Sequence, residues 1–243
     1  MNNTVYLVHA SDKYDWVIDK FVENHEKHFK NMCLDKIILT ESITKNWEGF
    51  KTECVGKNKS WSDGLIDWLL YCKYDNIIYV HEDYFLTSDT NNVLFFDLLD
   101  IFIKNNYNLL KICGSWSGSP EHNQPDKKPF INKKTHCIKS NDDSKSNDRF
   151  YDIYEYNNNL QYLVSHQTSI WDKDFLLSTL WRGWTPWDHE LTGTEILRYR
   201  NVKIHTYIGE PPIPYCEVIN RGKIRPGCEH YFQNMEDYNG KIL

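Results

Sequence analysis

The stretch IIYVHEDYF, residues 77–85, decides the fold that we expect for this chain. The apolar run NIIYV, residues 76–80, does not alternate with polar residues, which is typical of a strand covered on both faces in a parallel sheet. His81, Glu82 and Asp83 follow it directly. Because ligands bind at the carboxyl ends of strands in open α/β sheets, these three side chains predict a site at that edge.

The segments around this strand alternate strand-like apolar runs with helical periodicity. This order predicts an α/β fold with a Rossmann-like, mixed but mostly parallel central sheet flanked by helices. No linker divides the chain, so we expect a single domain over residues 1–243. Further strands are expected at 4–10, 35–41, 50–55, 108–114 and 202–208, and helices within 12–29, 60–74 and 92–104, from 172 and after 185.

Residues 117–159 interrupt this pattern. They are rich in Ser, Pro, Asn, Asp and Lys and have little periodicity, which predicts a long irregular insertion with one short strand near 150–154. A variable surface insertion and a lid over a site both fit this composition.

The bulk properties exclude several classes of protein. Of 243 residues, 28 are Lys or Arg and 34 are Asp or Glu, without a basic stripe, so we expect no nucleic-acid partner. Seven cysteines without a CxxC pair predict reduced thiols and no structural zinc. The N-terminus lacks a signal-peptide pattern, and Asp97 and Asp100 interrupt the longest apolar run. We therefore expect no transmembrane segment and a soluble, intracellular, cytoplasmic protein.

The acidic turn His81-Glu82-Asp83 suits a divalent metal ion. Carboxylates prefer Mg²⁺ or Mn²⁺, and a histidine ligand favours Mn²⁺ of the two. The alternatives are hydrogen bonds that ribose or sugar hydroxyls donate to the carboxylates, and a solvated acidic turn without function. His81 and Asp83 are therefore the candidate metal ligands.

The sequence TPWDHE, residues 185–190, places two carboxylates beside tryptophan at the start of an expected helix. A carboxylate next to apolar rings can have a raised pKa, which suits a general base. Glu190 and Asp188 are therefore the candidate bases, and the face of Trp187 can stack on a sugar ring. Acidic capping of the helix is the alternative, and it needs no chemistry.

The loop NRGKIRPG, residues 220–227, carries Arg221, Lys223 and Arg225 around a glycine in an acidic chain. A flexible basic loop can neutralise a leaving diphosphate. A plain basic surface loop is the alternative interpretation.

The loop HASDKYD, residues 9–15, follows the first expected strand. Polar residues there can contact a nucleotide base or ribose; the alternative is that Ser11 or Asp12 caps the following helix. The sequence contains neither GxGxxG nor GxxxxGK[ST], which argues against NAD-type and P-loop sites.

Five short motifs occur in an order that resembles the GT-A family of nucleotide-sugar glycosyltransferases. The likeness is closer to a microbial and viral branch of that family, and it spans residues 4–226. The motifs are WSDGL at 61–65, EDYFL at 82–86, QTSIW at 167–171, PWDHE at 186–190 and RGK at 221–223.

The resemblance implies a GT-A-like fold and an enzyme that transfers a sugar from a nucleotide-diphosphate donor, most often UDP-linked, to a hydroxyl of a glycan or glycoconjugate. Glu190 would be the base, with Asp188 as the alternative, and we expect inversion at the anomeric carbon. Glu82 and Asp83 would take the place of the family's DxD motif and, with His81, hold Mn²⁺ or Mg²⁺. In a metal-independent reaction the basic loop would neutralise the leaving diphosphate in place of the metal ion.

The candidate binding residues fall into two groups. Residues expected to bind the donor or its nucleotide are Ser11, Asp12, Lys13, Tyr14, Asp63, Glu82, Asp83, Arg221 and Lys223. Residues expected to bind the acceptor or to stack on a sugar are Trp116, Gln167, Trp171 and Trp187.

Two other functions stay open. A sugar-1-phosphate nucleotidyltransferase shares the α/β plan and the metal-binding carboxylates. It usually has a glycine-rich loop near the N-terminus, however, and residues 9–16 contain no glycine. A non-catalytic carbohydrate-binding module on a GT-A scaffold would keep a sugar site without turnover.

Overall fold

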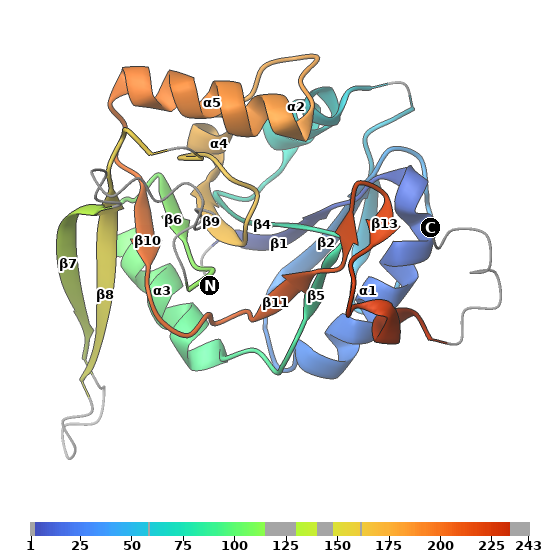
Figure 1. Cartoon of the computed structure of the whole chain (residues 1–243), viewed down its shortest axis with the longest axis horizontal. Helices are drawn as coiled ribbons and strands as arrows, with labels where there is room; N and C mark the ends of the chain where they lie inside the picture. The colour runs from blue at the N-terminus through green and yellow to red at the C-terminus, as the bar shows by residue number, and fades with distance from the viewer. Residues whose placement is uncertain (1–2, 58, 115–129, 140–147, 161, 234–243) are drawn as a thin grey trace.

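The computed structural model describes residues 3–57, 59–114, 130–139, 148–160 and 162–233, and within them nine strands form one sheet (Figure 1). All of these strands except β8 and β9 point the same way. The prediction of a mixed, mostly parallel α/β sheet is therefore confirmed. In order across the sheet, the strands are β3 (Lys51–Cys54), β2 (Asp35–Thr40), β1 (Thr4–His9), β4 (Asn76–His81), β9 (Ser169–Asp172), β6 (Leu109–Lys111), β10 (His205–Tyr207), β8 (Arg149–Tyr156) and β7 (Phe130–Ile138).

The apolar strand β1 lies between β2 and β4 and is parallel to both. Side chains alternate across a strand, so Val5 and Leu7 join the apolar cluster on one face of the sheet. Tyr6 and Val8 join the cluster on the other face. Because both faces are covered, successive positions are apolar, and the alternating pattern of a half-exposed strand is absent.

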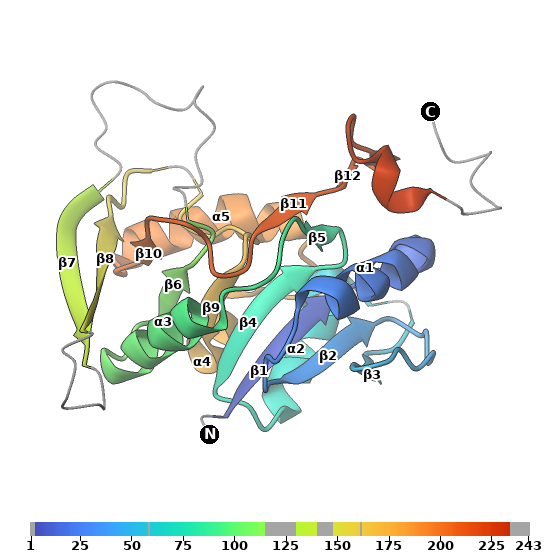
Figure 2. The ribbon, with the colours of Figure 1, turned by 90° about the horizontal axis from the view of Figure 1, so that it is seen from below.

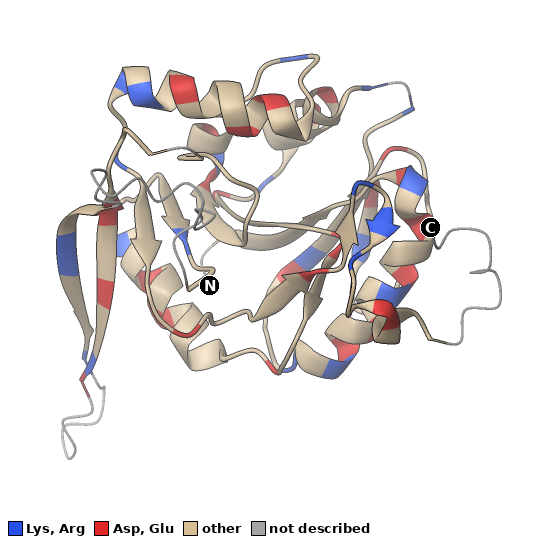
Figure 3. Ribbon diagram, viewed as in Figure 1, with Lys and Arg blue, Asp and Glu red and all other residues tan. Residues whose placement is uncertain are grey.

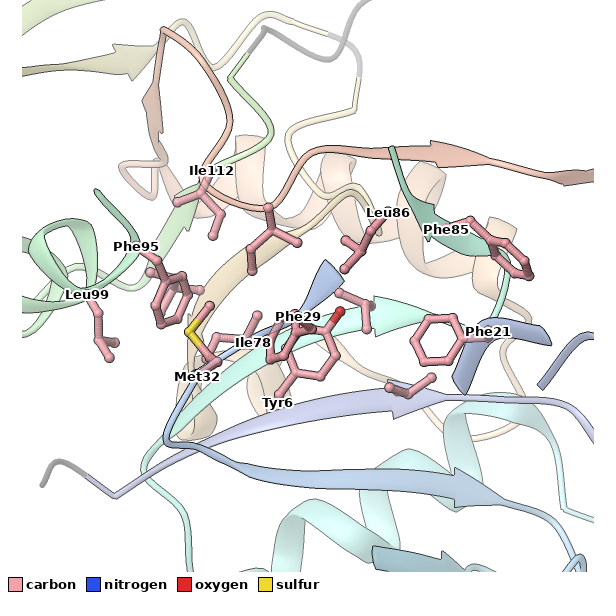
Figure 4. Close-up of a cluster of buried hydrophobic side chains, with 14 of the residues drawn as sticks. Tyr6, Phe21, Phe29, Met32, Ile78, Phe85, Leu86, Phe95, Leu99 and Ile112 are labelled. Atoms are coloured by element: carbon pink, nitrogen blue, oxygen red, sulfur yellow. The ribbon is translucent and has the colours of Figure 1, made fainter. Parts of the chain in front are cut away.

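Helices cover both faces of the sheet (Figures 1 and 2). Figure 4 shows part of one apolar cluster, to which Tyr6 of β1, Phe21 and Phe95 contribute. No helix within the described ranges is both long enough and apolar enough to cross a membrane. The helices on the Tyr6 face are α1 (Asp15–His28) and α3 (Asn92–Lys104), those on the Val5 face are α2 (Trp61–Tyr71), α4 (Lys173–Thr179) and α5 (Pro186–Arg200), and the 3-10 turns are η1 (Asp12–Tyr14) and η3 (Glu229–Phe232).

Two short ladders bring the C-terminal part of the chain beside the end of β4. The backbone N–H of Val218 donates to the Asp83 carbonyl at 2.8 Å, so residues distant in sequence meet at the acidic turn. Figures 1 and 2 both show this segment running along β5. The ladders pair β5 (Tyr84–Leu86) with β11 (Tyr215–Glu217), and β12 (Ile219–Asn220) with β13 (Lys223–Ile224).

The described parts of residues 117–159 differ from the predicted irregular insertion. β7 and β8 lie in this range and pair as a long antiparallel hairpin at the edge of the sheet. The strand expected near 150–154 is part of β8, whereas β7 was not expected. Its middle part, NKKTH at 132–136, is polar on both faces, so β7 lacks the apolar alternation that predicts a strand. Residues 117–129 and 140–147 lie outside the described part of the chain.

Candidate active site

A cavity of about 950 Å³ opens at the carboxyl ends of β1, β2 and β4. This volume lies within the range of small-molecule binding sites. Many of the residues that the sequence predicts for a site meet on its wall. These are Ser11, Tyr14, His81, Glu82, Asp83, Gln167, Trp187, Glu190 and Arg221.

The loops after β1 and β2 hold each other by reciprocal hydrogen bonds. The Asp12 carboxylate accepts the backbone N–H groups of Glu41 and Ser42, at 3.0 and 2.9 Å. The Glu41 carboxylate accepts the backbone N–H of Asp12 at 2.5 Å and the hydroxyl of Ser11 at 3.2 Å. Glu41 lines the cavity, but Asp12 is not part of the lining. Asp12 therefore shapes the loop, while Glu41 presents a carboxylate to the cavity.

The acidic turn after β4 places ionisable groups on the cavity wall. Glu82 is buried and accepts the backbone N–H of Ser11 at 3.2 Å, and burial raises the pKa of Glu82 to about 7. Burial, and then the charges of Glu82 and Glu217, raise the pKa of Asp83 well above its usual value. Burial lowers the pKa of His81 to about 4, so its imidazole is neutral near pH 7.

The cavity wall offers an incomplete set of metal ligands. Within the described ranges, no three His, Cys, Asp or Glu side chains are grouped closely enough to hold a metal ion. Asp83 and Glu217 both line the cavity, and burial raises the pKa of each carboxyl. A divalent cation would favour their charged forms, but it would need further oxygens, such as those of a bound phosphate. Mn²⁺ or Mg²⁺ at His81 and Asp83 therefore stays a prediction.

Glu190 lies in the N-terminal part of α5 and lines the cavity. Its Oε1 accepts the backbone N–H of His166 at 2.8 Å. Burial raises the pKa of Glu190, while the His166 N–H and the ammonium group of Lys111 act in the opposite sense. A carboxyl group with a raised pKa on a cavity wall can exchange a proton with a bound hydroxyl.

Asp188 lies in the same helix, but its carboxylate is already bonded. Oδ2 accepts the backbone N–H and the hydroxyl of Thr185, at 2.9 and 2.7 Å, and the Asp188 N–H donates to that hydroxyl at 3.2 Å. These contacts form a capping box, and the bond from the Thr185 hydroxyl is the main reason why the pKa of Asp188 is lowered. Asp188 is not among the residues that line the cavity. The structure thus places the alternative base in a helix cap.

Two other predicted residues have structural contacts instead of cavity positions. Trp171 of β9 is 0% exposed within the core, so the prediction that it stacks on a sugar is wrong. The Asp63 carboxylate accepts the Ser60 hydroxyl at 2.6 Å and pairs with Arg182 at 3.2 Å. Asp63 therefore stabilises the start of α2 and does not line the cavity.

Among the residues predicted to bind the acceptor, Trp187 and Gln167 line the cavity. Trp187 is 66% exposed, so its ring is accessible to a ligand, whereas the Gln167 amide oxygen accepts from the Cys113 thiol at 3.1 Å. Trp116 lies outside the described residues. Among the donor candidates, Lys13 and Lys223 are exposed and are not part of the lining.

The hairpin of β12 and β13 is rich in basic residues (Figure 3). It also contributes residues to the cavity wall. Arg221 and Gly222 form its two-residue turn, with φ angles of 52° and 79°. Both angles are positive, as in the type I′ turns that match the twist of paired strands. Arg221 lines the cavity, and so does Arg225, which pairs with Glu217.

His9 also lines the cavity, and it belongs to the loop HASDKYD whose polar residues the sequence suggests for the nucleotide. Glu41 was not singled out as a site residue, although it follows β2 directly and the strand-end rule that selected the acidic turn could have found it. His166 and Glu217 also line the cavity, but each reaches it through tertiary contacts for which we find no sequence pattern.

Neither a protein-family model nor a curated protein matches the chain, but solved structures do. Residues 1–349 of TarS from S. aureus match at a TM-score of 0.50 and 10% identity, over 88% of this chain and 59% of that one. The same fragment in complex with UDP-GlcNAc matches at 0.46 and 11%, over 88% and 57%. The mannosyltransferase PcManGT from Pyrobaculum calidifontis, in complex with GDP-Man and Mn²⁺, matches at 0.48 and 9%, over 90% and 58%.

The likeness to TarS identifies the class of fold. TarS is a GT-A glycosyltransferase, so the expected GT-A-like fold is confirmed. The chain spans less than two thirds of the length of each of these structures. At such low identity the likeness concerns the fold alone, and activity must be argued from the site.

Proposed function

We propose that this chain is a glycosyltransferase that moves a sugar from a nucleotide-diphosphate donor to a hydroxyl of a glycan or glycoconjugate. We also propose that it belongs to the GT-A branch whose motifs its sequence resembles. The observation that carries the proposal is that Glu190, the turn at Glu82 and Asp83, and Arg221 line one cavity. Glycosyl transfer needs a base for the acceptor, groups that hold the donor, and positive charge for the leaving diphosphate.

The donor is proposed to be a UDP-sugar. Its nucleotide would lie along the loop of Ser11 and Tyr14, which line the cavity beside the carboxylates of Glu41 and Glu82. Carboxylates at that position can accept hydrogen bonds from ribose hydroxyls. TarS 1–349, whose fold this chain shares, has been crystallised with UDP-GlcNAc and with UDP, which supports a uridine nucleotide.

The leaving diphosphate would meet positive charge at the tip of the β12–β13 hairpin. Arg221 carries a guanidinium group, which binds phosphate oxygens in a bidentate manner. With Mn²⁺ or Mg²⁺ present, Asp83 and His81 would hold the ion together with phosphate oxygens, and the ion would supply further charge neutralisation. In a metal-independent reaction, Arg221 would meet the phosphates, together with Arg225, which also lines the cavity.

The chemical step would use Glu190 as the base. Its carboxylate takes the proton of the acceptor hydroxyl while the acceptor oxygen forms a bond to the anomeric carbon. The bond from that carbon to the diphosphate oxygen breaks, and its electron pair leaves with the nucleoside diphosphate. A single displacement from the opposite face inverts the anomeric carbon. The exposed ring of Trp187 would carry the acceptor sugar by stacking.

Incubation with a panel of nucleotide-diphosphate sugars and glycan acceptors, followed by mass spectrometry of the products, tests the proposal. We expect transfer or slow donor hydrolysis with UDP-sugars. Pyrophosphate release from a nucleoside triphosphate and a sugar 1-phosphate would identify a nucleotidyltransferase instead. Glycan binding without turnover of any donor would identify a binding module.

A further inference from the structure

Four histidine rings form a cluster at the cavity, and the proposed reaction uses only His81. His9, His81 and His166 line the cavity, and His189 contacts His166. His166 lies at ring-centroid distances of 5.2 Å from both His81 and His189, and His9 stacks on Trp61 at 5.5 Å. Burial lowers the pKa of all four imidazoles, to about 3 for His9 and His189. Each neutral ring therefore carries one N–H donor and one lone-pair acceptor, and its neighbours decide which nitrogen is which.

Thr179 determines which nitrogen of His189, the first ring in a chain of hydrogen bonds, carries the proton. Its hydroxyl donates to the Leu176 carbonyl at 2.7 Å, and a carbonyl can only accept. The same hydroxyl lies 2.9 Å from Nε2 of His189. Because the hydroxyl hydrogen is already used, the Thr179 oxygen accepts, and Nε2 of His189 must carry the proton.

The tautomer of His166 follows from the tautomer of His189. Nδ1 of the neutral His189 is then a lone pair, and it lies 2.9 Å from Nε2 of His166. Nε2 of His166 must therefore be the donor, which leaves Nδ1 of His166 unprotonated. This nitrogen faces Oε1 of Glu190 at 3.8 Å.

The two distances between His166 and Glu190 agree with this direction of the chain. The backbone N–H of His166, which is a donor, approaches Oε1 to 2.8 Å. The side-chain nitrogen of the same residue stays at 3.8 Å from the same oxygen, as expected when two lone pairs face each other. A protonated Nδ1 would be expected to close this gap to a hydrogen bond.

We propose that the chain from Thr179 through His189 to His166 holds an unprotonated nitrogen toward Glu190, and so prepares an acceptor for the proton that Glu190 takes from the sugar hydroxyl. The role rests on the proposed function, in which Glu190 is the base. Once Glu190 is protonated, its new O–H can donate to Nδ1 of His166 after a small approach. His166 and His189 are thus positioning residues, and Thr179 sets their tautomers.

The other ionisable groups around Glu190 and His166 do not change the direction of the hydrogen-bond chain. Lys111 and Glu217 act on Glu190 with opposite signs, and Lys111 donates to the Tyr162 carbonyl at 2.9 Å. The rings that act on His166 are His189, His81 and His9, which burial keeps neutral. None of these groups supplies a proton to Nδ1 of His166 in the contacts of the described chain.

Nitrogen NMR of ¹⁵N-histidine-labelled protein at pH 7 tests the direction of the chain without any substrate. We expect His166 and His189 both to carry the proton on Nε2, with resonances assigned from the spectra of His166→Gln and His189→Gln. A proton on Nδ1 of His166 would overturn the proposal whether or not the protein is an enzyme.

Thr179→Val tests the catalytic use of the chain, because it keeps the shape and removes the hydroxyl. We expect kcat to fall about tenfold, since a misplaced catalytic group costs rate while donor affinity is kept, and the histidine resonances to shift. Thr179→Ser should restore both. Thr194→Val is the matched control: Thr194 is equally buried, and its hydroxyl accepts the Val164 N–H at 3.0 Å.

The outcomes separate the two proposals. An equal kcat for Thr179→Val and Thr194→Val in an active enzyme would overturn the role of the chain and leave the proposed function standing. A wild-type protein without turnover of any donor would overturn the proposed function, and the catalytic role of the chain with it. If Thr179→Val does not fold, the wild-type nitrogen spectrum still decides the direction of the chain: protons on Nε2 of both rings support it, and a proton on Nδ1 of His166 overturns it.

Discussion

Two carboxylates in α5 differ in chemistry because they differ in direction. Asp188 and Glu190 are two positions apart, which is about 200° around a helix, so their side chains point to opposite sides. The Asp188 carboxylate closes the capping box with Thr185, where hydrogen bonds lower its pKa. Glu190 lies on the cavity wall, where burial raises the pKa of its carboxyl group. The direction of the side chains therefore favours Glu190 over Asp188 as the base, a choice that the sequence PWDHE leaves open.

Glu190→Gln should lower kcat by about 10²- to 10⁴-fold, because the amide keeps the size of the side chain but cannot take a proton. Donor affinity should change little, and titration calorimetry with UDP checks this. Asp188→Asn is the matched control and should keep kcat within about twofold, because its carboxylate does not face the cavity. A similar loss of kcat in both variants would mean that the base is wrongly assigned.

The pH dependence of kcat should report the environment of Glu190. The base must be ionised, and burial raises its pKa above the usual 4.5, so activity should be lost as the pH falls through that raised value. A rate profile of the wild-type enzyme should therefore have an acidic limb with a midpoint above 4.5. Persistence of the same limb in the residual activity of Glu190→Gln would assign it to another group.

Glu82 should make the stability of the protein depend on pH. Burial raises its pKa from 4.5 to about 7, so within this window the folded state keeps a proton that the unfolded state has lost. Stability from this group is therefore complete below about pH 4.5 and decreases as the pH rises toward 7. Glu82→Gln has no such proton. Urea unfolding at pH 5 and pH 8 should show the variant gaining stability relative to the wild type at pH 8, and an unchanged difference would contradict this.

In the β12–β13 hairpin, a residue with a strained backbone conformation lies at the proposed binding site. Arg221 has a φ angle of 52° at the first position of the turn, where Asn or Gly is favoured. A positive φ costs a residue with a Cβ about 1 kcal/mol or more. The side chain at this costly position lines the cavity, which is consistent with a residue kept for its charge.

Arg221→Asn should stabilise the protein by up to about 1 kcal/mol, because Asn tolerates positive φ better. The same change should weaken the binding of UDP, because a cation near the diphosphate is lost. Urea unfolding and calorimetric titration measure the two effects. Lys223→Asn removes the same charge from an exposed residue outside the cavity and should leave affinity unchanged. Equal losses of affinity would show that the net charge of the hairpin matters and the position of Arg221 does not.

Elements could be predicted from the sequence where burial leaves a periodic pattern. β1 and β4 are apolar at successive positions because helices cover both faces of the sheet there. β7 could not be predicted, because an exposed edge strand is stabilised by pairing with β8 and needs no apolar face. Position at a strand end likewise predicted the acidic turn, but the contacts of Asp188 with Thr185 depend on side-chain orientation.

At the scale of the whole molecule, the site is made by segments that the sequence gives no reason to join. The acidic turn is built by β4, Glu217 comes from β11, and His166 precedes β9. Local patterns could find the first of these, because strand ends are visible in a sequence. They could not find the other two, because their positions depend on how the C-terminal segment and β9 pack against β4 and β5.

A crystal structure with UDP and Mn²⁺ bound tests the central claim most directly. We predict UDP in the cavity of about 950 Å³, its base beside the loop of Ser11 and Tyr14, and its diphosphate beside Arg221 and Asp83. Glu190 should then face the space next to the terminal phosphate, where the anomeric carbon of a donor would lie. UDP bound on another surface, or a cavity that stays empty at saturating UDP, would contradict the account.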